Sequence, residues 1–343
     1  MVVLAAVAFS APDANAQSTK LEFGFLGDTD YFLKTEKELP KMIAQMNNLD
    51  LSFVVHVGDF EADPRLYNRL PTKVSMPCTE KNFKRVLASF QTSKHPFVLT
   101  PGDNDWTDCI HLKAQKVNPL DALAMIRKMF FPKGKSLGQN PMSVVSQTND
   151  AGFSKFVENL TWSKGGVTFA TAHVVGSNNN MGKKPEPKAE FTERTTANTA
   201  WIKKAFAKAR SDNSLGLVLF IQANPFFEGA WRGRVLRRHF LPLGSLGIKA
   251  PKKPKPKRYG FDEFHQVLLA EFATYKKPTL LMHGDMHYVR VDKPLWDPKA
   301  KGFVPNFTRV ETFGNPTTGW MHVTVDPKDP DLFTIKPRMY RPN

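Results

Sequence analysis

Short runs of apolar residues alternate with stretches of helical periodicity along most of the chain. In residues 35–48, for example, Leu39, Met42, Ile43 and Met46 recur at the spacing of one helix face. Continuous apolar runs bounded by turn residues instead indicate buried strands. The pattern predicts helices at 35–48, 81–90, 195–209 and 261–275, and strands at 21–28, 51–59, 96–103, 165–175, 215–225 and 278–287. Strands that alternate with helices are typical of a parallel sheet in an α/β fold.

The predicted strands end in acidic and amide side chains. Four apolar runs lead into Gly-Asp, and two of them continue as GDTD and GDND. Because the carboxyl ends of parallel strands meet at one edge, we expect these side chains to surround one pocket. They are Asp28, Asp30, Asp59, Asp103, Asn104, Gln222, Asn224, His283, Asp285 and His287. Crowded carboxylates repel one another unless a cation compensates, so the pattern indicates one divalent metal ion, or two that share a carboxylate.

The last part of the chain differs in pattern and charge. Residues 307–313, 321–326 and 332–339 are predicted to form antiparallel strands. The segment 232–258 is a basic, Pro/Lys-rich insertion, which we interpret as a solvated loop. Contact with nucleic acid or an anionic surface is the alternative, but aromatic residues that would stack on bases do not interleave the basic run.

The composition is consistent with one large domain, which we place at residues 17–343. Of the 343 residues, 41% are hydrophobic and 23% are charged, so the chain can bury a sizeable core. The 48 Lys and Arg residues against 32 Asp and Glu give a net charge of +16. This excess favours anionic partners, among which phosphorylated substrates, nucleic acid and acidic membranes all qualify.

The first residues have the pattern of an export signal. The apolar run VVLAAVAF is followed by small residues at Ala14-Asn15-Ala16, which predicts a signal peptide over residues 1–16. The run is too short to span a bilayer, and we expect no transmembrane segment. The basic region that usually precedes such a run is missing, and a frayed tail is the alternative. With the signal, the protein is expected in the periplasm or outside the cell.

Two cysteines occur, Cys78 and Cys109. In an exported protein an even pair is expected to form a disulfide. The bridge would close a loop of about 31 residues and stabilise the fold by roughly 3 to 4 kcal/mol in the chain-entropy model. Two unrelated buried thiols are the alternative.

The order of these motifs resembles that of the calcineurin-like metallophosphoesterase superfamily. The family pattern is D-x-H, G-D, G-N-H-[DE], a His before Pro and G-H-x-H, each at a strand end. The chain has GDTD at 27–30, GD at 58–59, GDND at 102–105, NP at 224–225 and GDMH at 284–287. The likeness runs from residue 21 to about residue 337 and implies a four-layer α/β/β/α sandwich.

The resemblance also implies ligands for two divalent metal ions. Asp28, Asp59 and His287 would hold one ion, Asp59 would bridge to the second, and Asp103 stands where the family has an Asn ligand. The residues that replace family histidines are Asp30, Asn104, Asn224 and Asp285. Oxygen ligands favour Mn²⁺, Mg²⁺ or Ca²⁺ over Zn²⁺, with iron as a further candidate.

The implied activity is metal-dependent hydrolysis of a small phosphate ester. Asn104 can donate a hydrogen bond to the phosphate but cannot titrate near neutral pH, so we expect weak activity on poor leaving groups unless another residue helps. His283 is the nearest such candidate in the sequence. The alternative is a catalytically impaired, secreted binding protein on the same fold that holds an anionic ligand, and the replaced histidines favour it.

Several other polar residues have a structural explanation. His56 and His173 lie within strand patterns and are expected to be hydrogen-bonded core histidines. Trp106 is expected to pack beside the site. Residues 178–180, all Asn, are expected in a polar loop, with hydrogen bonds to a phosphate as the alternative.

Overall fold

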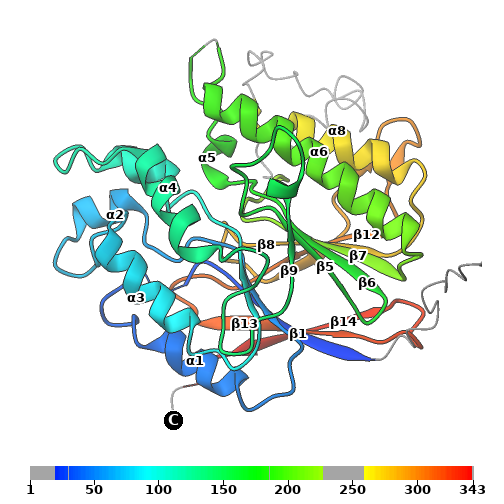
Figure 1. Ribbon diagram of the computed structural model, residues 1–343, viewed down its shortest axis with the longest axis horizontal. Coiled ribbons are helices and arrows are strands. Elements are labelled where there is room, and N and C mark those ends of the chain that lie inside the picture. The colour runs from blue at the N-terminus through cyan, green and yellow to red at the C-terminus, as the bar shows by residue number, and fades with distance from the viewer. Residues whose placement is uncertain (1–19, 30, 185, 227–258, 342–343) are drawn as a thin grey trace, which may run out of the picture.

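Two β-sheets with helices around them make up the computed structural model, which describes residues 20–29, 31–184, 186–226 and 259–341 (Figure 1). The predicted signal peptide at 1–16, the predicted ligand Asp30 and the insertion at 232–258 lie outside the described residues. In the described part of the chain, none of the helices is both long and apolar enough to cross a bilayer.

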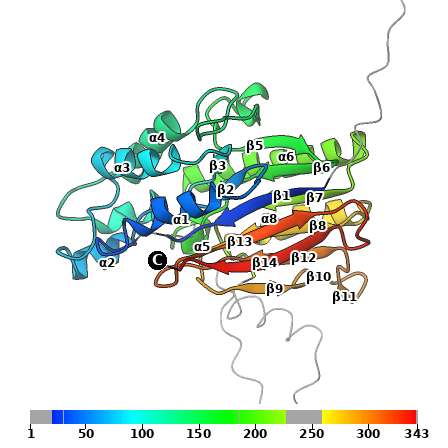
Figure 2. The ribbon, with the colours of Figure 1, turned by 90° about the horizontal axis from the view of Figure 1, so that it is seen from below.

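The first sheet carries the three N-terminal strands that lead into Gly-Asp. Its order is β14-β13-β1-β2-β3. The bounds are β1 Leu21–Leu26, β2 Val54–His56, β3 Phe97–Leu99, β13 Gly319–Val325 and β14 Phe333–Met339. β1, β2 and β3 are parallel, whereas β13 is antiparallel to both β1 and β14, and Figure 2 shows β1, β13 and β14 side by side. The parallel part of this sheet therefore presents three carboxyl ends at one edge.

The second sheet has the order β4-β5-β6-β7-β8-β12-β9. Its strands are β4 Val145–Ser146, β5 Leu160–Lys164, β6 Val167–Thr171, β7 Gly216–Phe220, β8 Thr279–His283, β9 Arg290–Asp292 and β12 Phe307–Glu311. β6, β7, β8 and β12 run parallel, and the outer strands are antiparallel. A separate two-stranded ribbon joins β10 Trp296–Asp297 and β11 Gly302–Phe303.

Some of the helices begin at residues whose side chains cap them. Thr79 accepts a hydrogen bond from the N–H of Asn82 at the start of α3, and Asn118 accepts one from Leu120 before Pro119 opens α4. The helices are α1 Glu38–Met46, α2 Pro64–Arg69, α3 Glu80–Phe90, α4 Pro119–Phe130, α5 Gly176–Asn179, α6 Ala189–Ser211 and α8 Asp262–Phe272, with 3-10 turns η1 Thr107–His111 and η2 Gln147–Asn149. α5 is a left-handed turn, as described below.

Strand alternation distributes apolar side chains between three clusters. In β7, Val218 and Phe220 pack with Phe23 and Phe25 of β1, so this cluster lies between the two sheets. Leu217 and Leu219 point the other way and pack with residues of α6 and α8. The third cluster joins α1, α3 and α4 to the first sheet. Figure 1 shows α6 and α8 on one side of the molecule and α1, α3 and α4 on the other.

The predicted α/β class is confirmed, with one strand paired differently from the prediction. The segment from residue 307 forms β12, which is parallel to β8, because it pairs inside the second sheet. The segments that form β13 and β14 are antiparallel strands as predicted. The predicted core histidines are confirmed too, since buried His56 bonds Thr29 and buried His173 bonds Glu158.

Candidate active site

The acidic side chains at the carboxyl ends of the strands lie together, although the chain brings them from positions up to 257 residues apart. The backbone N–H of Asp285 donates to both carboxylate oxygens of Asp28, at 3.1 and 3.0 Å. The side-chain amide of Gln222 donates to Asp59 at 3.2 Å and lies 3.5 Å from Oδ1 of Asp285. We call Asp28, Asp59, Asp103 and Asp285 the carboxylate cluster.

Gly176, just before the left-handed turn, lets two members of this cluster approach each other. A Cβ atom at Gly176 would lie 2.7 Å from both carboxylate oxygens of Asp103 and 2.7 Å from Oδ1 of Asp285. Both carboxylates therefore converge on the space that a side chain would fill. The N–H of Gly176 also donates to Oε1 of Gln222 at 2.6 Å, which orients the Gln222 amide group toward Asp59.

The backbone is strained at four of the predicted ligands. Asp28, Asp59, Asp285 and His287 have φ angles of 52°, 51°, 81° and 63°. The left-handed region is costly for residues other than glycine and persists only where the surrounding structure imposes it, most often at functional sites. Four of the residues that the sequence analysis selected for chemistry are thus among the strained positions of the chain.

Crowding changes the proton affinities of the cluster. Burial, followed by the neighbouring charges of Asp285, Glu311 and Asp103, raises the pKa of Asp28 well above its ordinary value. Burial and the charges of Asp103 and Asp28 raise the pKa of Asp59 in the same way. Burial also raises the pKa of Asp285, to about 6. Without a compensating cation, the folded chain therefore holds protons at this site that free carboxylic acids would release.

The donor set fits divalent cations. No group of three His, Cys, Asp or Glu side chains among the described residues already surrounds one point as ligands would. However, Oδ1 of Asp103 is buried and has no hydrogen-bond partner. A buried carboxylate oxygen that lacks a hydrogen bond and lies beside other carboxylates destabilises the fold, and a bound cation would offset this cost. Carboxylates are also the ligands that hard cations prefer.

The ring of His287 is oriented so that its Nε2 atom can act as a ligand. Its Nδ1 lies 2.6 Å from the carbonyl oxygen of Asn315, and a carbonyl can only accept, so Nδ1 carries the proton. The lone pair of Nε2 is then free, and Nε2 lies 3.6 Å from Oδ1 of Asp28. Burial lowers the pKa of His287, which keeps the ring neutral. This is the arrangement by which a backbone carbonyl orients a metal-binding imidazole.

Tyr31 is a site residue that the sequence analysis missed. Its hydroxyl donates to Oδ2 of Asp59 at 3.4 Å and accepts from the side-chain amide of Asn104 at 3.2 Å. That amide also donates to the carbonyl oxygen of Glu61, at 3.3 Å. The side-chain amide of the predicted donor Asn104 is thus engaged by Tyr31 and by the backbone of Glu61. Burial and the charge of Asp59 raise the pKa of the Tyr31 hydroxyl well above its ordinary value, so it stays a donor.

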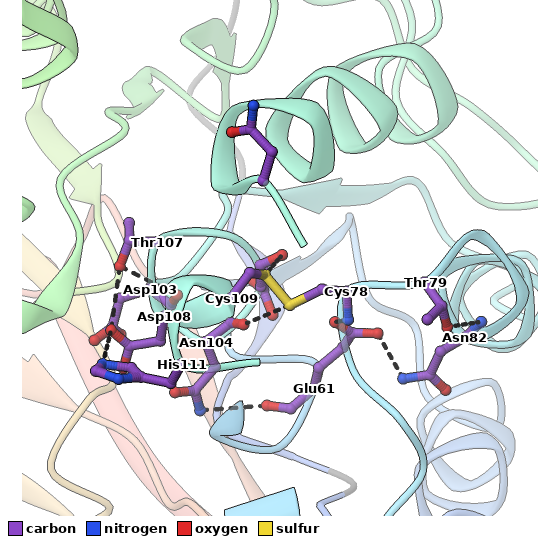
Figure 3. Close-up of a disulfide and its surroundings, with 12 residues drawn as sticks. Glu61, Cys78, Thr79, Asn82, Asp103, Asn104, Thr107, Asp108, Cys109 and His111 are labelled. Atoms are coloured by element: carbon purple, nitrogen blue, oxygen red, sulfur yellow. Dashed lines mark hydrogen bonds and ion pairs between the residues drawn. A yellow bond between two sulfur atoms is a disulfide. The ribbon is translucent and has the colours of Figure 1, made fainter. Parts of the chain in front are cut away.

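Asp105 holds two of the site loops together instead of facing the cluster. Its carboxylate accepts hydrogen bonds from the N–H groups of Gly102, Asp59 and Phe60, at 2.7, 3.0 and 2.9 Å. The Cys78–Cys109 disulfide, which confirms the predicted pairing, lies next to the same loop, as Figure 3 shows. Two contacts therefore fix the loop after β3. One is the hydrogen bond that the Asp105 carboxylate accepts from Gly102, and the other is the Cys78–Cys109 disulfide.

Two predicted residues differ from the cluster in their side-chain contacts, although the backbone N–H of Asn224 donates to Oδ2 of Asp285 at 2.9 Å. The Oδ1 atom of Asn224 accepts hydrogen bonds from the N–H of Phe226 at 3.0 Å and from Arg309 at 3.1 Å, so its ligand atom is already engaged. His283 is buried, and its Nδ1 lies 2.8 Å from the carbonyl oxygen of its neighbour Gly284. By strand alternation it shares a face with Leu281, which packs against α6 and α8 residues. Burial lowers the pKa of His283 to about 3, which does not suit a general acid near neutral pH.

Comparison with known proteins gives the fold a precedent. No family model matches the chain, and no curated protein matches it. Among solved structures, it is similar to a dimetal phosphatase from Danio rerio, with a TM-score of 0.52 and 9% identity over 93% of this chain and 96% of the other. The chain shares its overall fold with this phosphatase. A structure of PhoD also matches, with a TM-score of 0.45 and 12% identity over 96% of this chain and 70% of that one.

Proposed function

We propose that this protein is a metal-dependent phosphoesterase that acts on small phosphorylated substrates. The observation that carries the proposal is the convergence of four carboxylates and one neutral imidazole at the strand ends, with an Asp103 oxygen left without a partner. The fold shared with a dimetal phosphatase supports it. Export to the periplasm or the exterior is part of the proposal, and the disulfide is compatible with it.

Two divalent ions, with Mn²⁺, Mg²⁺ or Ca²⁺ favoured, would occupy the cluster. Asp28, Asp59 and His287 would hold one ion, and Asp59 would be shared with a second ion at Asp103 and Asp285. When bound, such ions supply Lewis-acid charge for the phosphate oxygens and activate water for attack on phosphorus. The carboxylates would then be fully ionised, because the cations offset the repulsion that raises their pKa values.

The remaining polar side chains of the site orient the carboxylates and donate hydrogen bonds. The amide of Gln222 holds the carboxylates of Asp59 and Asp285 in place. The protonated hydroxyl of Tyr31 donates to Asp59, and its single proton would turn to a phosphate oxygen if one bound there in place of that hydrogen bond. Asn104 keeps that hydroxyl in position. Amide side chains do not titrate and the pKa of Tyr31 is raised, so none of these three residues is an acid suited to neutral pH, and substrates with good leaving groups should react fastest.

The binding-protein alternative retains one specific observation in its favour. Neither His56 nor His283 has a hydrogen bond or ion pair to the cluster in the described part of the chain, and His287 is held as a neutral ring. A fold can keep its metal site after losing the acid that assists the leaving group.

The test combines metal content with turnover. The protein is purified in Mn²⁺, its metal is quantified, and hydrolysis of 4-nitrophenyl phosphate and bis(4-nitrophenyl) phosphate is measured for the parent and for Asp59→Asn. Outer-shell changes at metal sites already cost about 10- to 100-fold, so loss of the shared ligand should lower turnover by at least about a hundredfold. Asp50→Asn, an exposed site far from the cluster in the fold, is the matched control and should change neither quantity.

Each outcome decides between the two functions. Metal binding with turnover that depends on Asp59 supports the esterase. Metal bound by the parent and lost in Asp59→Asn, without turnover of either ester, supports the binding protein. A parent that binds no metal would contradict the esterase and leave the binding protein, which can hold an anion without a metal.

A further inference from the structure

A pocket of about 880 Å³ opens beside the carboxylate cluster. Thr107, Asp108 and Ser177 form part of its wall. The hydroxyl of Thr107 donates to the backbone carbonyl of Asp103 at 3.4 Å, and the hydroxyl of Ser177 donates to Asp108 at 2.9 Å. Figure 3 shows Thr107 and Asp108 next to Asp103. The pocket wall is thus bonded to the residue that carries the unpartnered carboxylate oxygen.

A strained turn forms another part of the wall. The four residues from Ser177 to Asn180 have φ angles between 47° and 57°, so they make a left-handed turn without any glycine. Such residues cost roughly 1 to 2 kcal/mol each and normally occur singly. A run of four is maintained only by strong surrounding contacts, and strain kept in this way marks functional segments.

The asparagine side chains supply those contacts. Asn179 accepts from the buried guanidinium of Arg194 at 2.5 Å, and Asn180 donates to Glu190 and accepts from Lys188, both at 2.7 Å. Asn178 accepts from the N–H of Gly260 at 2.9 Å. These amides hold the turn itself, as the polar-loop prediction has it. The turn gives the pocket a rigid wall.

The charge of the lining favours anions. Four cationic side chains line the pocket, against the two carboxylates of Asp108 and Glu186: Arg65, Lys183, Lys184 and Lys188. Arg65 forms ion pairs with Asp63 and Asp108, and the lining as a whole carries more positive than negative charge. Ile110, whose exposed fraction is 55%, and Pro187 add apolar surface to the same lining. The volume is that of a pocket for a small organic molecule and far exceeds the space that one phosphate group needs.

We propose that this pocket binds the organic part of the substrate and selects phosphate esters whose organic part carries a second anionic group. This inference rests on the proposed function, which places the phosphate group that is cleaved at the carboxylate cluster. The lysines at 183 and 184 would attract the second charge, while Ile110 and the aliphatic lysine stems would contact the carbon skeleton. An ester with a neutral organic part would lose the first of these contacts.

Two isosteric esters test the proposal. 4-Carboxyphenyl phosphate and 4-carbamoylphenyl phosphate have nearly the same shape and differ in the charge of the ring substituent. We expect the parent to hydrolyse the carboxylate ester with a kcat/KM about tenfold higher at low ionic strength, and this ratio to shrink as salt screens the lysines. In the double variant Lys183→Ala/Lys184→Ala the ratio should fall to about one. The control Lys41→Ala/Lys203→Ala removes the same charge from exposed positions of α1 and α6 and should keep the ratio.

A binding measurement separates this proposal from the esterase. The non-hydrolysable pair (4-carboxybenzyl)phosphonate and (4-carbamoylbenzyl)phosphonate is titrated calorimetrically into the Mn²⁺-loaded protein. Tighter binding of the carboxylate, lost in the Lys183/Lys184 variant, supports the pocket even if neither ester is hydrolysed. Equal affinity of the parent for both phosphonates, no binding of either, or a preference that survives in the double variant would overturn the proposal.

Discussion

Asp103 and Asp105 are two positions apart in the same acidic run, yet their carboxylates have different environments. Asp103 lies in the cluster with one oxygen unpartnered, whereas Asp105 accepts three backbone N–H groups from the loops after β2 and β3. Both are carboxylates at a strand end, so residue type alone does not distinguish the proposed metal ligand from the residue that fixes the loop.

The role of Asp105 gives a stability prediction. Asp105→Ala leaves the N–H groups of Gly102, Asp59 and Phe60 buried without acceptors, and each unsatisfied group costs about 1 to 3 kcal/mol. Relief of the buried charge offsets part of this, so we expect the free energy of unfolding to fall by about 3 kcal/mol. Urea titration in EDTA measures it without any metal contribution. Asp105→Asn, which keeps one acceptor oxygen, should lose less, and an equal loss in both variants would contradict this role.

Partners distant in sequence explain why some site residues could not be predicted. The motifs selected Asp28, Asp59, Asp103 and Asp285, which meet at one edge, because parallel strands fix where their carboxyl ends lie. The side-chain oxygen of Asn224 accepts a hydrogen bond from Arg309, which lies 85 positions away. Arg309 belongs to a strand whose pairing the sequence pattern did not indicate. Tyr31 was missed because a tyrosine after an acidic turn carries no spacing signal of its own.

At the scale of elements, the segment after β6 shows how a short turn shapes the site. The run SNNN was expected to be a polar loop, and its asparagines do favour turns and left-handed backbone. Hydrogen bonds to Arg194, Glu190 and Gly260, which lie elsewhere in the fold, hold these residues in a run of four left-handed conformations. The local sequence predicts an irregular segment here, but it does not predict that the backbone turns in the left-handed sense.

Gly176 offers a direct test of how this turn meets the cluster. In Gly176→Ala the new methyl group would lie 2.7 Å from oxygens of Asp103 and Asp285, closer than packed atoms allow, so one carboxylate has to move. We expect Mn²⁺ affinity to fall by at least about tenfold, in line with other changes that disturb ligand orientation. Calorimetric titration of the metal measures it. Gly302→Ala, where the nearest atom is 3.9 Å away, is the matched control, and equal affinities in both variants would argue against the close approach of the turn to the cluster.

At the scale of the whole molecule, a strongly basic chain encloses an acidic centre. The net charge is +16, while the strands bring together four carboxylates, of which Asp28, Asp59 and Asp103 are buried and Asp285 is partly exposed. A surface of this sign raises the local concentration of anionic substrates, and the acidic centre attracts cations that bridge the two. The overall balance was readable from composition, but the burial of the negative centre follows only from the way two sheets place their strand ends.

The buried charge makes the stability of the metal-free protein depend on pH in a defined sense. The folded pKa of Asp285 is about 6, above its ordinary value of 3.8. The folded state therefore binds this proton more tightly than the unfolded chain does, and the associated stability is present below about pH 4 and is lost as the pH rises through 6. His56 and His283 act in the opposite sense, because burial lowers their pKa values to about 3. The net slope of the parent alone is thus not diagnostic.

A difference measurement isolates the cluster. In EDTA, Asp285→Asn removes one buried charge and its repulsion on Asp28 and Asp103, while the histidines remain in both proteins. We expect the melting temperature of the variant minus that of the parent to increase by on the order of 2 to 5 °C between pH 4.5 and pH 7.5. Mn²⁺ should reverse the sign at pH 7.5, because the parent keeps a carboxylate ligand that the variant lacks and ligand binding to the native state stabilises it. A difference that stays constant with pH and does not respond to Mn²⁺ would mean that Asp285 is neither buried among like charges nor near a bound cation, and the proposed site would lose one of its four carboxylates.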